Sequence, residues 1–272
     1  MLARRELPTN YRNWDLTWGA PGGRHKGLVA QLGRVPRTTR EAIFGNPRVQ
    51  RVRGPFAFQP NTSTRAYEYP WAYYQMAQLK PSRVLEIGGA LSGLQFVLAK
   101  DGHEVHNVDP FLDYGVGDYD VDPIEEHAAL NRAFDTNVVL HCATLPETEL
   151  KGTFAAAYCI STIEHLLPAE IEATLVAVKK LLAPGGLLVL TIDLFLNLTP
   201  FCDRATNAWG TNASVAWIDE LIGYEMVAGE KSELYGFPEF STEAILSRLE
   251  EFAIGSHYPQ LAQLVAFKAP GA

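Results

Sequence analysis

The sequence has few of the features that mark secreted, metal-binding or membrane proteins. Its three cysteines have no paired spacing, so neither a disulfide framework nor a zinc site is indicated. The first residues, Met1–Glu6, lack the apolar core of a signal peptide. The most apolar run, Leu187–Leu198, is interrupted by Asp193 and is too short to cross a bilayer. We therefore expect a cytoplasmic protein without a membrane span.

Positive charge is concentrated in the first 65 residues. They hold twelve basic and three acidic residues, a net charge of +9, so the other 207 residues carry −17 of the total of −8. We favour an arm packed against its own acidic domain, because the arginines are scattered and lack the aromatic interleaving of a single-strand binder. The alternative is a surface for an anionic metabolite or RNA. We divide the chain into a basic extension, 1–65, and a domain, 66–272, with a substrate-side insertion at 195–245.

The stretch from Arg83 to Asp109 carries the most specific pattern. A short apolar strand, Val84–Ile87, runs into a loop of small residues and then into an apolar helix pattern. A second strand, Glu104–Val108, ends on the acidic Asp109. This order is typical of a β-α-β nucleotide-binding unit. The small residues let the backbone approach a ligand closely, and the acidic side chain can accept both hydroxyl protons of a ribose.

The loop differs from a dinucleotide site in two ways. It reads Gly-Gly-Ala-Leu-Ser-Gly over 88–93, so Ala90 replaces the second glycine of G-x-G-x-x-G. Glu86, at the end of the first strand, would repel a pyrophosphate but not a cofactor with a cationic centre and a free ammonium. Here the chain resembles the class I S-adenosylmethionine-dependent methyltransferases. Their first motif, hydrophobic-hydrophobic-(Glu/Asp)-x-Gly-x-Gly-x-Gly, is matched by Val84–Gly88, with Ala90 and Ser92 at the later glycine positions.

The resemblance extends over the rest of the domain, where strands and helices alternate. Leu145-Pro146 follows the third strand, Ser161–Leu166 follows the fourth, and Leu182–Leu190 holds a Pro-Gly-Gly turn before the fifth. The family fold implied is α/β, doubly wound around a seven-stranded, mostly parallel sheet of order 3-2-1-4-5-7-6. We expect strands at 137–141, 154–160 and 187–192, helices at 67–79, 122–134 and 169–182, and a terminal hairpin that pairs 252–257 with 261–267.

The resemblance also implies the cofactor, S-adenosylmethionine, and the residues around it. Family members often have an acidic residue near the end of strand three, where this chain has His141-Cys142-Ala143-Thr144. The residues expected at the cofactor are Arg65 and Tyr69 at the methionine carboxylate, Glu86, Gly88, Gly89, Ala90 and Gly93 along the loop, Asp109 at the ribose, Pro110, Phe111, Ala143 and Thr144 around the adenine, and Ser161 after strand four.

Methyl transfer from a sulfonium is an in-line displacement, in which the enzyme mainly aligns the reactants and excludes water. A base is needed only if the acceptor arrives protonated. His165 is the best candidate by residue type, and Asp193 is the second. The structural alternative for His165 is a hydrogen bond at the start of a helix, and the alternative for Asp193 is to anchor a loop. Small-RNA 2′-O-methyltransferases have a metal-binding Glu at the position of Ser161, so we expect no metal site.

The acceptor is the least defined part of the prediction. Residues 195–240 hold eight aromatic side chains, which either pack a subdomain or form a lid over an aromatic or sugar-like acceptor. The Asn/Asp-Pro-Pro-aromatic segment of many amine methylases is absent, which favours oxygen over nitrogen. We therefore expect methyl transfer to a small-molecule acceptor. The alternatives are an RNA methyltransferase that uses the basic extension and a non-catalytic S-adenosylmethionine-binding module.

Overall fold

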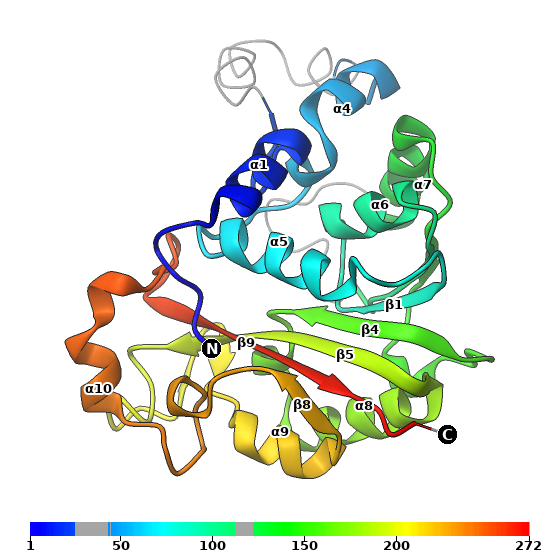
Figure 1. Cartoon of the computed structure of the whole chain (residues 1–272). Coiled ribbons are helices and arrows are strands. Elements are labelled where there is room, and N and C mark those ends of the chain that lie inside the picture. The colour runs from blue at the N-terminus through cyan, green and yellow to red at the C-terminus, as the bar shows by residue number, and fades with distance from the viewer. Residues whose placement is uncertain (25–42, 44, 112–121, 272) are drawn as a thin grey trace.

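A seven-stranded sheet runs through the protein (Figure 1). The computed structural model describes residues 1–24, 43, 45–111 and 122–271. The sheet order is β3-β2-β1-β4-β5-β9-β8, with β1 to β5 parallel and β9 antiparallel to both neighbours. The strands are β1 Arg83–Ile87, β2 Glu104–Val108, β3 Val139–His141, β4 Phe154–Ile160, β5 Leu182–Phe195, β8 Glu225–Ala228 and β9 Gln260–Lys268. The doubly wound α/β class and the strand order expected from the sequence are confirmed.

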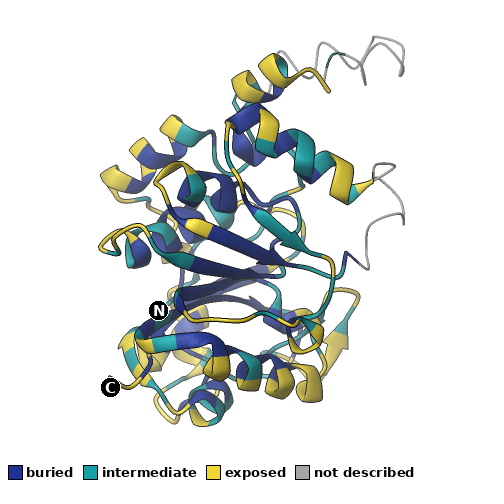
Figure 2. Ribbon diagram, turned by 90° about the vertical axis from the view of Figure 1, so that its right-hand side faces the viewer, coloured by how far each residue is buried: buried dark blue, intermediate teal, exposed yellow. Residues whose placement is uncertain are grey.

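Helices cover both faces of the sheet (Figure 1). One face carries α1 Thr9–Trp18, α4 Pro47–Arg53, α5 Arg65–Met76, α6 Gly93–Lys100 and α7 Pro123–Phe134; the other carries α8 Pro168–Leu181 and α9 Val215–Ile222. Alternate strand residues serve the two sides, as Val84 packs with the first group and Leu85 with the second. The central strands are therefore buried on both faces (Figure 2).

Several short helices and a small hairpin complete the fold. They are η1 Pro55–Ala57, η2 Leu145–Glu147, η3 Ile163–His165, η4 Lys231–Glu233, η5 Leu249–Glu251, α10 Thr242–Ser247 and a hairpin of β6 Thr206–Asn207 with β7 Gly210–Thr211. Local sequence sets several boundaries. The Asp122 carboxylate caps α7 by accepting from the Ile124 amide at 2.8 Å, and Ser92 caps α6 at the Leu94 amide.

The expected terminal hairpin is wrong in its first strand. Residues 252–257 form only an isolated bridge between Phe252 and Arg4. The antiparallel partner of β9 is β8, which lies inside the segment expected to be an insertion. The apolar run at 252–254 gives way to Gly255-Ser256-His257, whereas Met226 of β8 packs against the buried core of the α8 face.

Two other boundaries differ from expectation. Helix α5 begins at Arg65 rather than Tyr67, so Pro70 lies inside the helix instead of in its first turn. Strand β5 continues to Phe195, which places Asp193 within the strand rather than after it. The sequence also allows short helices near Lys26–Leu32 and Thr38–Phe44, and these segments lie outside the described residues, except for Ile43.

The beginning of the chain packs against the edge of the sheet. Leu2 forms a bridge with Gln263 of β9, and its amide donates to Glu233 at 3.0 Å. The Arg4 guanidinium donates to the same buried carboxylate at 2.7 Å. These contacts agree with the packed-arm interpretation for this part of the basic extension. Among the residues that the structure describes, no helix is both long and apolar enough to cross a membrane.

Candidate cofactor and acceptor site

The loop between β1 and α6 has the backbone shape of a ligand-binding turn. Gly88 has φ +67° and Ala90 has φ +44°, both in the left-handed region. The Gly88 amide donates to the Val108 carbonyl at 2.9 Å, which ties the loop to β2. A Cβ atom at Gly88 would overlap the side chain of Thr162, so glycine is required there by the protein itself.

Asp109 joins this loop to the chain after β2. Its Oδ2 accepts from the Ala90 amide at 2.8 Å, and its Oδ1 accepts from the Phe111 amide at 2.7 Å. Each carboxylate oxygen can accept more than one hydrogen bond, so two backbone amides orient the group without exhausting it. This arrangement fits a ligand that presents a pair of hydroxyls beside a small-residue loop.

Glu86 packs against the loop from the interior of the protein. Its side chain is buried, and Oε1 accepts from the Ser92 hydroxyl at 2.7 Å. A Cβ atom on Gly89 would overlap the Glu86 carboxyl group. Burial raises the pKa of Glu86 to about 8. Glu86 therefore supports the loop through Ser92 and Gly89, and its cofactor contact remains a prediction.

Sequence reasoning missed a buried polar chain that holds the loop carbonyl. Asn107 and Gln95 both donate side-chain N–H groups to the Ala90 carbonyl, at 2.8 and 3.2 Å. His127 bonds to the Gln95 carbonyl oxygen at 2.9 Å, and burial lowers the pKa of this histidine to about 4. These residues belong to β2, α6 and α7 and form no contiguous motif. Only their shared, fully buried location identifies them.

The residues expected at the methionine end are bonded within the protein. Arg65 donates from Nη1 to Glu68 at 2.5 Å and to the Ser161 hydroxyl at 2.6 Å. The Tyr69 hydroxyl donates to Asn61 at 2.7 Å. Arg65 and Ser161 thus lie together at the ends of α5 and β4, whereas the hydroxyl of Tyr69 is directed to the segment before α5. Their cofactor contacts remain predictions.

The adenine side is built from three chain segments. The Asp109 amide donates to the His141 carbonyl at 3.0 Å, which sets Pro110 and Phe111 beside the end of β3. Phe111 has φ +52° and is buried. The Thr144 hydroxyl donates to Glu147 at 2.7 Å, and the same carboxylate accepts from the Thr144 amide at 3.3 Å, which forms a capping box at the start of η2. Pro110, Phe111, Ala143 and Thr144 consequently flank the end of β3, as a role beside the adenine requires.

Gly93 is packed against the segment that precedes α5. A Cβ atom there would lie 2.6 Å from the ring of Phe56, which is buried. Phe56 in turn contacts Tyr69, with ring centroids 4.8 Å apart, and Trp14 of α1, at 5.4 Å. Residues near the start of the chain therefore cover the start of α6.

A buried charged network, here called the strand-end cluster, lies where β4 and β5 end. It consists of Arg65, Glu68, Ser161, Glu164, Thr191, Asp193 and Gln260. Asp193 accepts from Ser161 at 3.1 Å and from the Gln260 amide group at 3.0 Å. Glu164 accepts from the Asp193 amide at 3.1 Å. One guanidinium thus faces three carboxylates inside the protein.

The cluster holds more carboxyl groups than its one guanidinium can pair. Glu68 Oε1 and Glu164 Oε2 are buried without a hydrogen-bond partner among the described residues. Burial raises the pKa of Asp193 to about 7, against the pull of the Arg65 charge. Burial and the neighbouring Asp193 charge raise the pKa of Glu164 well above its ordinary value. Burial therefore favours the protonated form of both carboxyl groups.

His165 lies on the same turn as Glu164 but outside the cluster. It ends η3 and is exposed, and its amide donates to the Thr162 carbonyl at 3.1 Å. The structure therefore brings Asp193, Arg65 and Ser161 together and leaves the His165 ring nearer to solvent. The described residues contain no group of three or more His, Cys, Asp or Glu side chains that could hold a metal ion.

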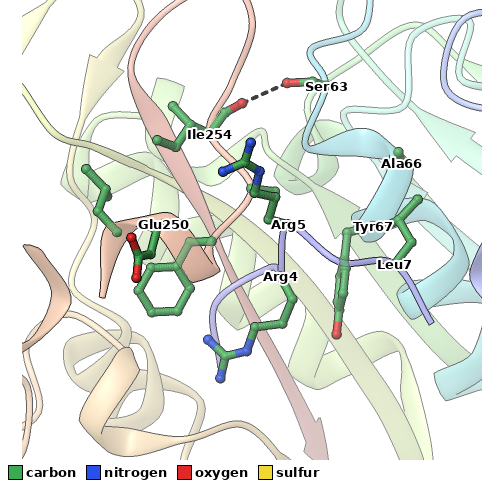
Figure 3. Close-up of a pocket in the computed structure, with 11 residues that line it drawn as sticks. Arg4, Arg5, Leu7, Ser63, Ala66, Tyr67, Glu250 and Ile254 are labelled. Carbon is green, nitrogen blue, oxygen red and sulfur yellow. Dashed lines mark hydrogen bonds between the residues drawn. The ribbon is translucent and has the colours of Figure 1, made fainter. Parts of the chain in front are cut away.

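A cavity of about 580 Å³ has no residue of the predicted loop in its lining. Figure 3 shows the side chains that line it. It opens between the first residues of the chain, the start of α5 and the segment at 249–254. Arg4, Arg5, Tyr67 and Ile254 line it. None of its lining residues is a predicted site residue, so the contacts above, and not this cavity, define the candidate site.

Comparison with known proteins relates the chain by fold alone. No family model and no curated protein matches the sequence. Among solved structures, the [4+2]-cyclase SpnF has a TM-score of 0.56 and 11% identity, over 86% of this chain and 96% of that one. A Burkholderia thailandensis 1,6-didemethyltoxoflavin-N1-methyltransferase, with bound 1,6-didemethyltoxoflavin and S-adenosylhomocysteine, has a TM-score of 0.51 and 14% identity, over 99% of this chain and 95% of that one. The N-methyltransferase NodS from Bradyrhizobium japonicum, in complex with S-adenosylhomocysteine, has a TM-score of 0.50 and 14% identity, over 86% of this chain and 97% of that one.

These findings define the class of fold. The protein has the architecture of the class I S-adenosylmethionine-dependent methyltransferases, and the resemblance found in the sequence is confirmed at that level. The cyclase among the neighbours bears the name of another reaction. The chemistry must therefore be argued from the site.

Proposed function

We propose that the protein transfers a methyl group from S-adenosylmethionine to a small-molecule acceptor. The observation that carries the proposal is the bond between Asp109 and the Ala90 amide, which unites the small-residue loop with a fixed carboxylate at the end of β2. This arrangement suits a ribose next to a closely approached backbone. Two of the neighbours named above are N-methyltransferases with bound S-adenosylhomocysteine, which supports the choice of cofactor.

The residues divide the work as follows. Asp109 would accept the ribose hydroxyls, and Gly88 and Ala90 would let the cofactor approach the backbone. When bound, S-adenosylmethionine supplies an electrophilic methyl group on sulfur. Asp193 near the end of β5 is the proposed proton acceptor, because burial raises its pKa above that of an ordinary carboxyl group and so makes its carboxylate a stronger base. The exposed His165 is the second candidate.

The acceptor atom is open to two arguments. The missing Asn/Asp-Pro-Pro-aromatic segment favours oxygen. The strand-end cluster, with three carboxyl groups and one guanidinium, offers no excess of positive charge that would bind a carboxylate or phosphate. Together the two arguments favour a small molecule with an oxygen nucleophile that is not strongly anionic.

A fractionated extract tests the proposal. The protein is incubated with S-adenosylmethionine and either the small-molecule or the RNA fraction of cells, and S-adenosylhomocysteine is measured. We expect product only with small molecules, and mass spectrometry should find a metabolite heavier by one methylene. Product only with RNA would instead support the RNA methyltransferase. Cofactor binding without product from either fraction would support the non-catalytic module.

A further inference from the structure

The cavity shown in Figure 3 has a largely apolar lining. Its volume of about 580 Å³ lies within the range of small-molecule sites, roughly 300–1,000 Å³. The buried side chains of Tyr67 and Phe252 form part of the lining, and Leu7, Leu249 and Ile254 add further apolar surface. The cavity can therefore take an apolar group out of water.

Hydrogen bonds between distant segments hold the walls of this cavity together. The Arg5 amide donates to the Glu251 carbonyl at 2.8 Å, which joins the first residues of the chain to the segment at 249–254. The Ser63 hydroxyl donates to the Ile254 carbonyl at 2.8 Å, which joins the same segment to the start of α5 (Figure 3). The protein itself therefore forms the cavity, without the help of a ligand.

Two exposed side chains of opposite charge line the cavity. They are Arg5 and Glu250, and neither side chain forms a hydrogen bond or an ion pair with another described residue. Both also line a second cavity, together with Glu6, so they lie near each other. Arg4, by contrast, is paired with Glu233. The cavity of Figure 3 thus offers a guanidinium and a carboxylate that are both available to a ligand.

These features select the charge of the ligand. A ligand with a single charge would be repelled by one of the two groups, and an uncharged ligand would use neither. We infer that the cavity binds an α-amino acid with a large apolar side chain, with its carboxylate at Arg5 and its ammonium group at Glu250. Its side chain packs against Tyr67, Phe252 and Ile254. A guanidinium suits a carboxylate because it can donate two parallel hydrogen bonds to it.

The inference goes beyond the proposed function and does not depend on it. No residue that lines the cavity belongs to the loop at 88–93 or to the strand-end cluster. The walls nevertheless continue into that cluster. Ser63 precedes Arg65 by two residues, and the chain after Ile254 leads to Gln260, which donates to Asp193 at 3.0 Å. Two chain segments therefore connect a bound amino acid to the candidate site.

Binding of four probes tests the inference without any turnover. Phenylalanine carries all three groups, whereas 3-phenylpropanoate lacks the ammonium group, phenethylamine lacks the carboxylate and glycine lacks the apolar side chain. Ligand-detected NMR titrations measure the four dissociation constants. We expect phenylalanine to bind roughly three- to thirtyfold more tightly than each of the other probes. No binding of phenylalanine at millimolar concentration, or equal affinity for either singly charged probe, would overturn the inference.

Variants of the two exposed charges locate the binding. Arg5→Gln should weaken the binding of phenylalanine and 3-phenylpropanoate but not of phenethylamine. Glu250→Gln should weaken the binding of phenylalanine and phenethylamine but not of 3-phenylpropanoate. Arg12→Gln and Glu239→Gln remove exposed charges outside the cavity and should change none of these affinities. Phenylalanine affinity that neither Arg5→Gln nor Glu250→Gln lowers would place the binding elsewhere and contradict the inference.

Discussion

The Asp109 carboxylate and the Ala90 amide, nineteen positions apart, are joined by a hydrogen bond of 2.8 Å. The acidic residue that the sequence marks as a ribose ligand is therefore also a clamp on the glycine loop. The second oxygen of Asp109 holds the Phe111 amide, so one side chain organises the backbone on both sides of the expected ribose. A substitution at Asp109 must affect the shape of the loop as well as the ligand contacts.

Replacing Asp109 by Ala should lower the affinity for S-adenosylmethionine at least tenfold. The change removes charge-assisted hydrogen bonds to the ribose, each worth roughly 1.5–3 kcal/mol, and frees the Ala90 amide. Calorimetry measures the affinity, and far-ultraviolet circular dichroism checks that the fold persists. A folded variant that binds the cofactor as tightly as the parent would remove Asp109 from the site.

Gly93→Ala should destabilise the protein by roughly 1–3 kcal/mol, because the added methyl group meets the Phe56 ring in a packed interior. Phe56→Leu makes room for that methyl group at a cost of its own. The double variant should therefore be more stable than the sum of the two single changes predicts. Urea unfolding of all four proteins measures this coupling, and strict additivity would contradict the packing described.

The buried Glu86 should make stability fall as pH rises. Its pKa is about 8 in the folded protein and 4.5 when exposed, so between these values the folded state keeps a proton that the unfolded state releases. This contribution is most favourable below pH 4.5 and is lost by pH 8. Glu86→Gln has no such proton. Its free energy of unfolding, relative to that of the unmodified protein, should therefore rise by roughly 3–5 kcal/mol between pH 5 and 9. Parallel pH profiles from urea unfolding would show that Glu86 is not buried as described.

Glu233→Ala should cost roughly 1.5–3 kcal/mol of unfolding free energy. Glu233 is buried and accepts hydrogen bonds from the Arg4 guanidinium and the Leu2 amide. The matched control is Glu239→Ala, an exposed residue that should change stability by less than about 0.5 kcal/mol. Thermal unfolding compares the two. Equal effects would mean that the basic arm is not anchored through this carboxylate.

Asp193→Asn should reduce turnover by roughly 10²–10⁴ once an acceptor is in hand, because an amide cannot accept the proton. His165→Ala should cost less than about fivefold, since the exposed ring lies outside the strand-end cluster. Both variants should retain S-adenosylhomocysteine affinity. The opposite ranking of the two variants would restore His165 as the base.

The sequence predicts the parts of the fold that depend on local pattern. The β1-loop-α6-β2 unit, β4 and α7 lie where alternation, small residues and caps indicate them. It does not predict β8 as the partner of β9, because pairing across more than thirty residues is decided by which apolar strand best covers the sheet edge. Nor does any spacing reveal that Glu68 meets Asp193 through Ser161. Such contacts arise only when α5, β4 and β5 converge.

The most direct test of the central claim is a calorimetric titration of the unmodified protein with S-adenosylhomocysteine. We expect saturable binding at one site per chain, strongly weakened by Asp109→Ala and little changed by Glu239→Ala. Asp109 clamps the loop, whereas Glu239 is an exposed side chain outside the candidate site. No binding at millimolar ligand, or binding that Asp109→Ala leaves unchanged, would contradict it.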